Sequence, residues 1–232
     1  MDHNFIIQKW SVWPPVQSGV DNETSIQSER LSFIPKMLRR RLTALAKIVF
    51  CAASPCIDEN KNIPAVFSST HGELAKSFAM MEMIEAGEEI SPTTFSLSVH
   101  NSIAGLFSIV YKNKLQATVV APGEEGIAAA FIEALGLLEE GAEEVLIIFY
   151  DEPLVSFYPS APFQLSSDQS CAVALRISKT GDGLPLRFSQ LKGQGYDGEQ
   201  AMQVPMLISF LADPEKNLLI QTARHNWSWE RG

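Results

Sequence analysis

Apolar residues recur along the chain with two different periods, and each period predicts a different kind of element. Glu144 to Tyr150 (EVLIIFY) has no polar alternation, which predicts a strand covered on both faces. Residues 127–141 (IAAAFIEALGLLEEG) are apolar on nearly all sides, with Glu133 as the one interruption before the Glu139-Glu140 end, so they predict a helix in the middle of the protein. Phe5 to Trp13 (FIIQKWSVW) is rich in β-formers and predicts a first strand that ends at Pro14-Pro15.

Similar reasoning predicts the remaining elements. Residues 17–32 are polar and predict a loop, and the apolar spacing after Pro35 predicts one amphipathic helix through residue 53. Further helices are expected at 72–86, 101–112 and from Pro205 to 211, and further strands at 63–69, 115–120, 171–178 and 217–223, whereas no element is assigned to 184–191. Strands that alternate with helices in this order predict an α/β fold, with a mixed, mostly parallel sheet covered by helices on both faces.

Length and charge narrow the range of functions. A chain of 232 residues fits a single domain, with residues 179–232 as a divergent C-terminal extension. The 27 acidic and 18 basic residues give a net charge of −9, which argues against nucleic acid or an anionic membrane as partner. The sequence shows neither a signal-peptide pattern nor a run of about 18 apolar residues, so we expect a cytoplasmic protein without a membrane span.

Three cysteines, Cys51, Cys56 and Cys171, form no CxxC pair. Because the cytosol keeps thiols reduced, they are expected to be free thiols that fill the core, and no metal or other cofactor is expected.

The strand at 115–120, the turn at Gly123 and the helix that follows have the architecture of a nucleophile elbow. Such a turn exposes a side chain at a helix N-terminus, where backbone N–H groups and the helix dipole stabilise an anion and lower the pKa of a cysteine. The exposed positions of this elbow are Glu124 and Glu125.

Two long segments resemble the N-terminal half of the β-ketoacyl synthases. They are SPTTFSLSVHNSIAGLFSI and TVVAPGEEGIAAAFIEALGLLEEGAEEVLIIFYDEPL, supported by MLRRRLTALAK and VFSSTHGELAKSF in a pattern that covers roughly residues 5–178. The chain is most similar to the short synthase-like proteins called chain length factors of aryl polyene pathways. The resemblance implies a thiolase-like fold that lacks the C-terminal half of a full ketosynthase.

The resemblance also implies that the chain does not catalyse condensation. Counting at the ketosynthase spacing from Gly105, or back from Gly141, places Glu124 at the nucleophile position, far from all three cysteines. The two downstream histidines of active synthases have no counterpart. A carboxylate is a weak nucleophile whose acyl product is a hydrolysable anhydride, so Glu124 is expected to act as a helix N-terminal cap.

What remains is a partner role. The resemblance implies heterodimerisation with a complete ketosynthase through the strand at 115–120, and a share in the tunnel that holds the acyl chain of an acyl carrier protein. The residues that this assigns to tunnel or interface are His100, Asn101, Phe107, Tyr111, Val119, Val120, Glu124 and Glu125. Phe107 and Tyr111 fit a plain core role equally well. The run Arg39, Arg40 and Arg41 is a candidate docking site for the acidic carrier protein, although such a trio is more often simply solvated.

Other functions stay open at this point. An independent thioesterase or acyltransferase-like enzyme would use Glu124 or Asp151 with His100, and a homodimeric binder of acyl chains or carrier proteins would need no synthase. Asp151-Glu152 could bind a cation or act in acid–base chemistry, but a solvated strand end before Pro153 explains the pair more simply. Ser68, Ser69 and Thr70 beside His71 hint at a hydrolase, yet the chain has no G-x-S-x-G elbow.

Overall fold

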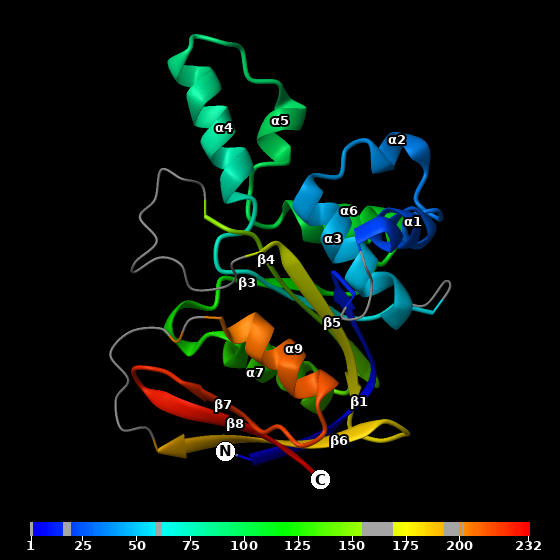
Figure 1. Cartoon of the computed structure of the whole chain (residues 1–232), viewed down its shortest axis with the longest axis vertical. Helices are drawn as coiled ribbons and strands as arrows, with labels where there is room; N and C mark the ends of the chain where they lie inside the picture. The colour runs from blue at the N-terminus through cyan, green and yellow to red at the C-terminus, as the bar shows by residue number, and fades with distance from the viewer. Residues whose placement is uncertain (1, 16–19, 59–61, 155–168, 193–199, 201) are drawn as a thin grey trace.

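One curved sheet of eight strands organises the molecule (Figure 1). The computed structural model describes residues 2–15, 20–58, 62–154, 169–192, 200 and 202–232. The strands are β1 (Asp2–Trp13), β2 (Ala65–Ser68), β3 (Ala117–Val120), β4 (Glu144–Asp151), β5 (Cys171–Ser178), β6 (Leu184–Lys192), β7 (Leu218–Gln221) and β8 (His225–Arg231). Their order in the sheet is β3-β2-β4-β5-β1-β6-β8-β7, so β3 and β7 are the edge strands.

The sheet is mixed, as expected, but parallel pairing is confined to β3, β2 and β4. Every other neighbouring pair is antiparallel, so the expectation of a mostly parallel sheet is wrong. The connections account for part of this pattern: helices cross over between the parallel neighbours β2 and β3, whereas a short turn joins the antiparallel neighbours β7 and β8. The N-terminal strand β1 lies between β5 and β6 and runs antiparallel to both.

The helices are α1 (Val20–Arg30), α2 (Lys36–Arg39), α3 (Ala44–Ala53), α4 (Leu74–Glu85), α5 (Pro92–Ser96), α6 (Ser102–Tyr111), α7 (Ile127–Glu139) and α9 (Gln203–Ala212), with the short 3₁₀ turns η1 (Ser54–Cys56) and η2 (Gly123–Glu125). The predicted helix at 35–53 is therefore two helices. Thr43 breaks it, because its side chain accepts a hydrogen bond from Ala46 N and caps α3. The predicted loop at 17–32 contains α1, whose Arg30 donates to Cys51 O at 2.8 Å and so ties this polar helix to α3.

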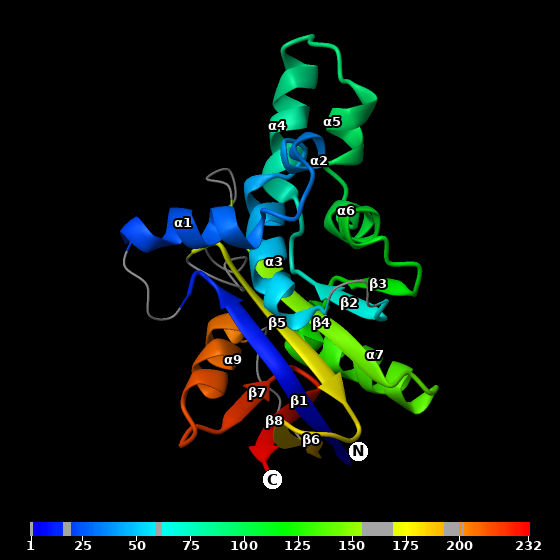
Figure 2. The same ribbon diagram turned by 90° about the vertical axis from the view of Figure 1, so that its right-hand side faces the viewer.

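Strand β4 separates two hydrophobic clusters, as its uninterrupted apolar run predicts. Val145, Ile147 and Phe149 face the cluster around α7 and α9. Leu146, Ile148 and Tyr150 face the cluster around α3 and α6. Helices thus cover both faces of the central strands (Figure 2).

The sheet bends round α7, which lies with α9 between β4–β5 and β7–β8 (Figure 1). The contacts of Phe131 show this enclosure, because its ring lies 5.5 Å from that of Phe149 in β4, 5.9 Å from Phe188 in β6 and 5.2 Å from Trp229 in β8. Strands β6 and β8 and helix α9 therefore cover the far side of the helix that the sequence predicts to be buried. None of the described helices is long and apolar enough to cross a membrane.

Candidate functional site

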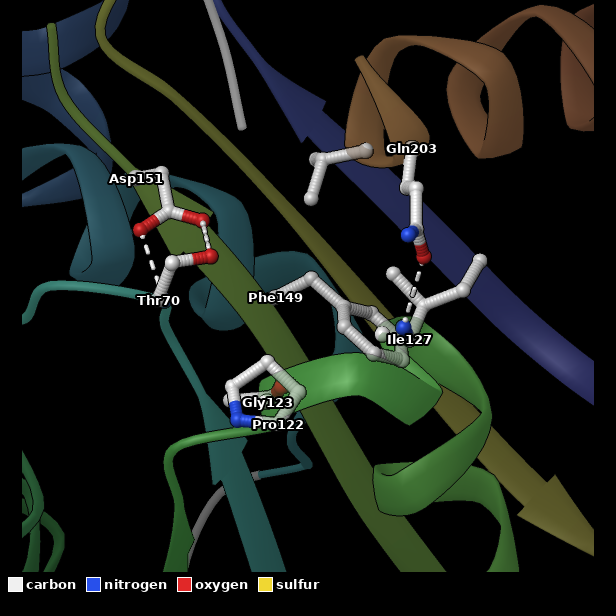
Figure 3. Close-up of a pocket in the computed structure, with 10 residues that line it drawn as sticks. Thr70, Pro122, Gly123, Ile127, Phe149, Asp151 and Gln203 are labelled. Atoms are coloured by element: carbon white, nitrogen blue, oxygen red, sulfur yellow. Dashed lines mark hydrogen bonds between the residues drawn. The ribbon is translucent and has the colours of Figure 1, made fainter. Parts of the chain in front are cut away.

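A small pocket lies where β2 and β4 end, in front of the N-terminus of α7 (Figure 3). Its wall includes Ser68, Thr70, Gly123, Gly126, Asp151 and Gln203. The cavity holds about 20 Å³, which is room for a single water-sized molecule. An acyl chain does not fit into it.

The N-terminus of α7 is capped from α9. Ile127 N donates to Gln203 Oε1 at 2.9 Å (Figure 3). Gln203 Nε2 donates in turn to Gln200 O at 3.0 Å. Gly126 is the N-cap residue and has a φ of 56°, and a Cβ built there would lie 1.9 Å from Gln203 Oε1. Only glycine leaves room for the Gln203 amide.

This arrangement corrects the expectation that Glu124 caps the helix. The N-cap position belongs to Gly126, two residues further on, and the capping oxygen comes from Gln203. The backbone of Glu124 lies in η2, and its side chain is outside the described residues. Its assignment to the nucleophile position stays a prediction.

The neighbouring Glu125 is turned toward the C-terminal hairpin of its own chain. Its Oε2 accepts a hydrogen bond from Trp227 Nε1 at 2.8 Å, and its Oε1 lies 3.3 Å from His225 Nδ1. Thr222 Oγ1 is 3.5 Å from Oε2. Sequence reasoning missed Gln203, His225 and Trp227 as neighbours of the elbow, because 76 to 102 residues separate each of them from its partner.

Asp151 is not at a solvated strand end, as the sequence suggests, but is buried with 3% of its surface exposed. Its Oδ1 accepts from Ser69 Oγ and from Thr70 N, both at 2.9 Å, and the backbone N–H of His71 also donates to the carboxylate. Burial raises its pKa to about 7, while the hydrogen bonds from Ser69, Thr70 and His71 act in the opposite direction.

Two more carboxylates lie close by. Glu73, which is 4% exposed, accepts from Thr43 Oγ1 at 2.5 Å, and burial raises its pKa to about 7, with the nearby charge of Glu152 adding to the shift. Burial also raises the pKa of Glu152, whose carboxylate accepts from the backbone N–H of Ala75. Each carboxylate has hydrogen-bond donors of its own, and no group of three or more metal-ligating side chains among the described residues could hold a metal ion.

The raised pKa of Glu73 predicts a pH-dependent stability. The folded protein holds this proton more tightly than the unfolded chain, so the contribution of Glu73 to stability falls as pH rises from about 4.5 to about 7. Between pH 5 and pH 8 the wild type should lose about 2 kcal/mol more unfolding free energy than Glu73→Gln, whose amide oxygen still accepts from Thr43. Urea unfolding of both proteins at the two pH values measures this difference, and equal losses would show that Glu73 is ionised throughout.

His100 holds a backbone turn. Its Nε2 lies 2.9 Å from Ser69 O, and its ring covers Gly72, where a Cβ would lie 2.7 Å from His100 Cδ2. The ring of His100 therefore has a structural role, as the partner of a backbone carbonyl. The exposed Asn101 precedes α6 and lines a surface groove between α5 and α6. Asp151, which a thioesterase would use together with His100, already accepts hydrogen bonds from Ser69 and Thr70 of this turn.

Phe107 is core in this structure. Its side chain is 0% exposed, and its ring lies 4.6 Å from Tyr111, 5.2 Å from Phe67 and 6.2 Å from Phe50. Burial raises the pKa of Tyr111, which stacks on Phe50. Neither Phe107 nor Tyr111 lines a described pocket.

Val119 and Val120 lie on the edge strand β3 and pack, half-buried, against opposite hydrophobic clusters.

The three residues of the arginine run differ in their surroundings. Arg39 donates to Ser32 O at 3.0 Å and to Ile34 O at 2.9 Å, whereas Arg40 and Arg41 are exposed. All three cysteines are buried thiols that form no disulfide, and burial raises the pKa of Cys51 and of Cys56 to about 12.

The sheet, the elbow and the central helix α7 define a ketosynthase-like half-fold. Residues 10–230 match the family described as "Beta-ketoacyl synthase, N-terminal domain", and the chain belongs to this family. The curated proteins include no match.

Solved structures support the same fold. The chain is similar to one chain of the structure described as the ketosynthase ApeO in complex with its chain length factor ApeC from Xenorhabdus doucetiae. The TM-score is 0.78 at 22% identity, and the match covers 99% of this chain and 100% of that chain. It is also similar to the ishigamide ketosynthase/chain length factor, with a TM-score of 0.62, 13% identity and coverage of 83% and 68%. A β-ketoacyl synthase from Burkholderia phymatum STM815 matches with a TM-score of 0.56, 10% identity and coverage of 90% and 69%. The expected thiolase-like ketosynthase fold is confirmed.

Proposed function

We propose that this protein is a non-catalytic chain length factor that forms a heterodimer with a complete ketosynthase in a type II polyketide system of the aryl polyene kind. The observation that carries the proposal is the closed elbow. The N-terminus of α7 is capped by Gln203, and the cavity in front of it holds about 20 Å³. An acyl-enzyme intermediate needs a thiolate and open space at this point, so the chemistry falls to the partner.

The edge strand β3 supports the choice of interface. Among the described residues β3 pairs only with β2, so its other side is a sheet edge to which a partner strand can pair. Large apolar side chains are exposed close to it, with Leu115 46% exposed just before β3 and Ile109 60% exposed on α6. Together these features suit an apolar interface of the size found in obligate dimers, on the order of 2,000 Å².

A proline in β3 tests the interface. The carbonyls of Gln116 and Val120 accept from β2, so the alternation of the strand directs Val119 N–H away from β2. Val119→Pro removes that donor and should weaken binding to the ketosynthase about ten- to hundredfold, while Val119→Ala keeps the donor and removes more of the side chain. Titration of the labelled ketosynthase measures both affinities. Equal weakening by the two variants would place the effect in the side chain and argue against strand pairing.

The remaining assignments follow from this arrangement. Val119 and Val120 are the residues of β3 that we assign to the interface and the adjoining tunnel, and we assign His100 and Asn101 to the same region. Arg40 and Arg41 are the cations of the arginine run that stay available to an acidic carrier protein. The partner supplies the cysteine and both histidines, and product length follows from where bulky side chains end the tunnel.

Sizing chromatography distinguishes this function from an independent thioesterase and from a homodimeric binder. The chain is expressed alone and together with each complete ketosynthase of its source organism, and every peak is assayed for thioester turnover. We expect a heterodimer with turnover and no turnover from the chain alone. Turnover by the chain alone indicates the thioesterase, and a stable homodimer that ignores every ketosynthase indicates the binder.

A further inference from the structure

Helices α4 and α5 form an arm, residues 73–98, that projects from the body of the molecule (Figures 1 and 2). Neither helix contains a buried residue, and Met81, Ile84 and Phe95 are 48%, 59% and 58% exposed. The arm therefore has no hydrophobic core of its own to fix its direction. Its orientation depends on the residues at its base.

The segment that leads into the arm is organised by Asp151. Besides the two bonds to Oδ1 from Ser69 Oγ and Thr70 N, Thr70 Oγ1 lies 3.4 Å from Oδ2 (Figure 3). Ser69 Oγ in turn accepts from Gly72 N at 2.7 Å. One buried carboxylate at the end of β4 thus fixes four consecutive residues before α4 begins.

The segment that leads out of the arm is fastened to the same turn by His100. A carbonyl oxygen only accepts, so His100 Nε2–H donates to Ser69 O. The imidazole lies against Gly72, whose φ of 57° and missing Cβ make room for it. A second bond, from Ser77 Oγ to Ser98 O at 2.7 Å, joins the two sides just above.

We propose that Asp151 and His100 are positioning residues that set the direction in which the arm leaves the sheet and so prepare its exposed apolar side chains for the partner subunit. That the partner is a ketosynthase rests on the proposed function. The positioning itself belongs to this chain and is measurable without a partner.

Amide hydrogen exchange of Asp151→Asn at pH 8 tests the proposal. Asparagine offers one acceptor oxygen and turns an N–H₂ group toward donors, so the turn at residues 69–72 loses its anchor. We expect exchange in residues 69–101 to rise about tenfold while β4 and β5 stay protected, because a local opening leaves the core closed. Asp182→Asn, the same change at an exposed turn, is the matched control and should alter neither region.

His100 provides the second pair of variants, which needs no change at the buried carboxylate. His100→Ala loses the bond to Ser69 O, whereas the amide N–H of His100→Gln can restore it. Loosening of the arm in the alanine variant and its rescue by glutamine support the proposal. An equal rise in amide exchange across the arm and the sheet would overturn the proposal. So would an arm that exchanges as in the wild type in both Asp151→Asn and His100→Ala.

Binding to the ketosynthase is measured separately. Weaker binding of Asp151→Asn with intact exchange protection in β4 and β5 supports the role toward the partner. If the wild type binds no ketosynthase, the proposed function fails, and the exchange result still decides whether Asp151 and His100 position the arm.

Discussion

Phe107→Ala is expected to lower the free energy of unfolding by about 3–5 kcal/mol, which corresponds to a fall in Tm of roughly 8–15 °C for a chain of this size. The physical reason is its place between α3, α6 and β2, where its ring contacts Phe50, Phe67 and Tyr111 and no part of its side chain is exposed. Removing the ring leaves a cavity that these neighbours fill only in part.

The result separates two roles that the sequence leaves open for Phe107. A tunnel-lining side chain would change product length when truncated, with little effect on the stability of the chain. Phe95→Ala makes the same chemical change at a site that is 58% exposed, and it should alter stability by no more than about 0.5 kcal/mol. Chemical denaturation measures both variants, and a Phe107→Ala protein as stable as Phe95→Ala would remove Phe107 from the core.

Trp229→Ala should have a similar effect, about 3–5 kcal/mol. Trp229 is 0% exposed, and its ring lies 5.2 Å from Phe131 in α7 and 4.9 Å from Phe188 in β6. The variant therefore opens the cluster that encloses α7, although only three residues follow Trp229 in the sequence. Because Trp227 in the same strand holds Glu125, loosening β8 should also disturb the elbow.

A graded control is available at this position. Trp229→Phe keeps an aromatic ring against Phe131 and should retain most of the stability, so the order wild type, phenylalanine, alanine is expected in urea unfolding. If Trp229→Ala unfolds at the wild-type urea concentration, residues 179–232 are an appendage and do not cover α7.

The fold was predictable wherever periodicity is strong. The uninterrupted apolar run of β4 and the apolar circumference of α7 both identify buried elements, and the structure places them on either side of a common core. The division at Thr43 was harder, since the apolar spacing continues across it. Thr43 lies three residues before Ala46 and accepts a hydrogen bond from its backbone N–H. This is a recognisable capping pattern, but the apolar periodicity alone does not reveal it.

The candidate site was predictable only in part, because its decisive contacts are long-range. Asp151-Glu152 followed by proline is typical of a solvated turn, and nothing local reveals that Ser69 and Thr70 fold onto the carboxylate. The family match extends to residue 230, but the ketosynthase motifs recognised in the sequence end near residue 178. They therefore gave no indication that Gln203 lies at the N-terminus of α7.

Under the proposed function this chain carries out no acyl chemistry of its own, and intact-mass spectrometry tests this directly. The purified chain is incubated with malonyl and acyl thioesters of a carrier protein, and its mass is followed with and without the ketosynthase. We expect the mass of this chain to stay unchanged in both samples, with extended products only where the ketosynthase is present. A covalent acyl adduct on this chain, or an extended product formed in its presence alone, would contradict the proposed function.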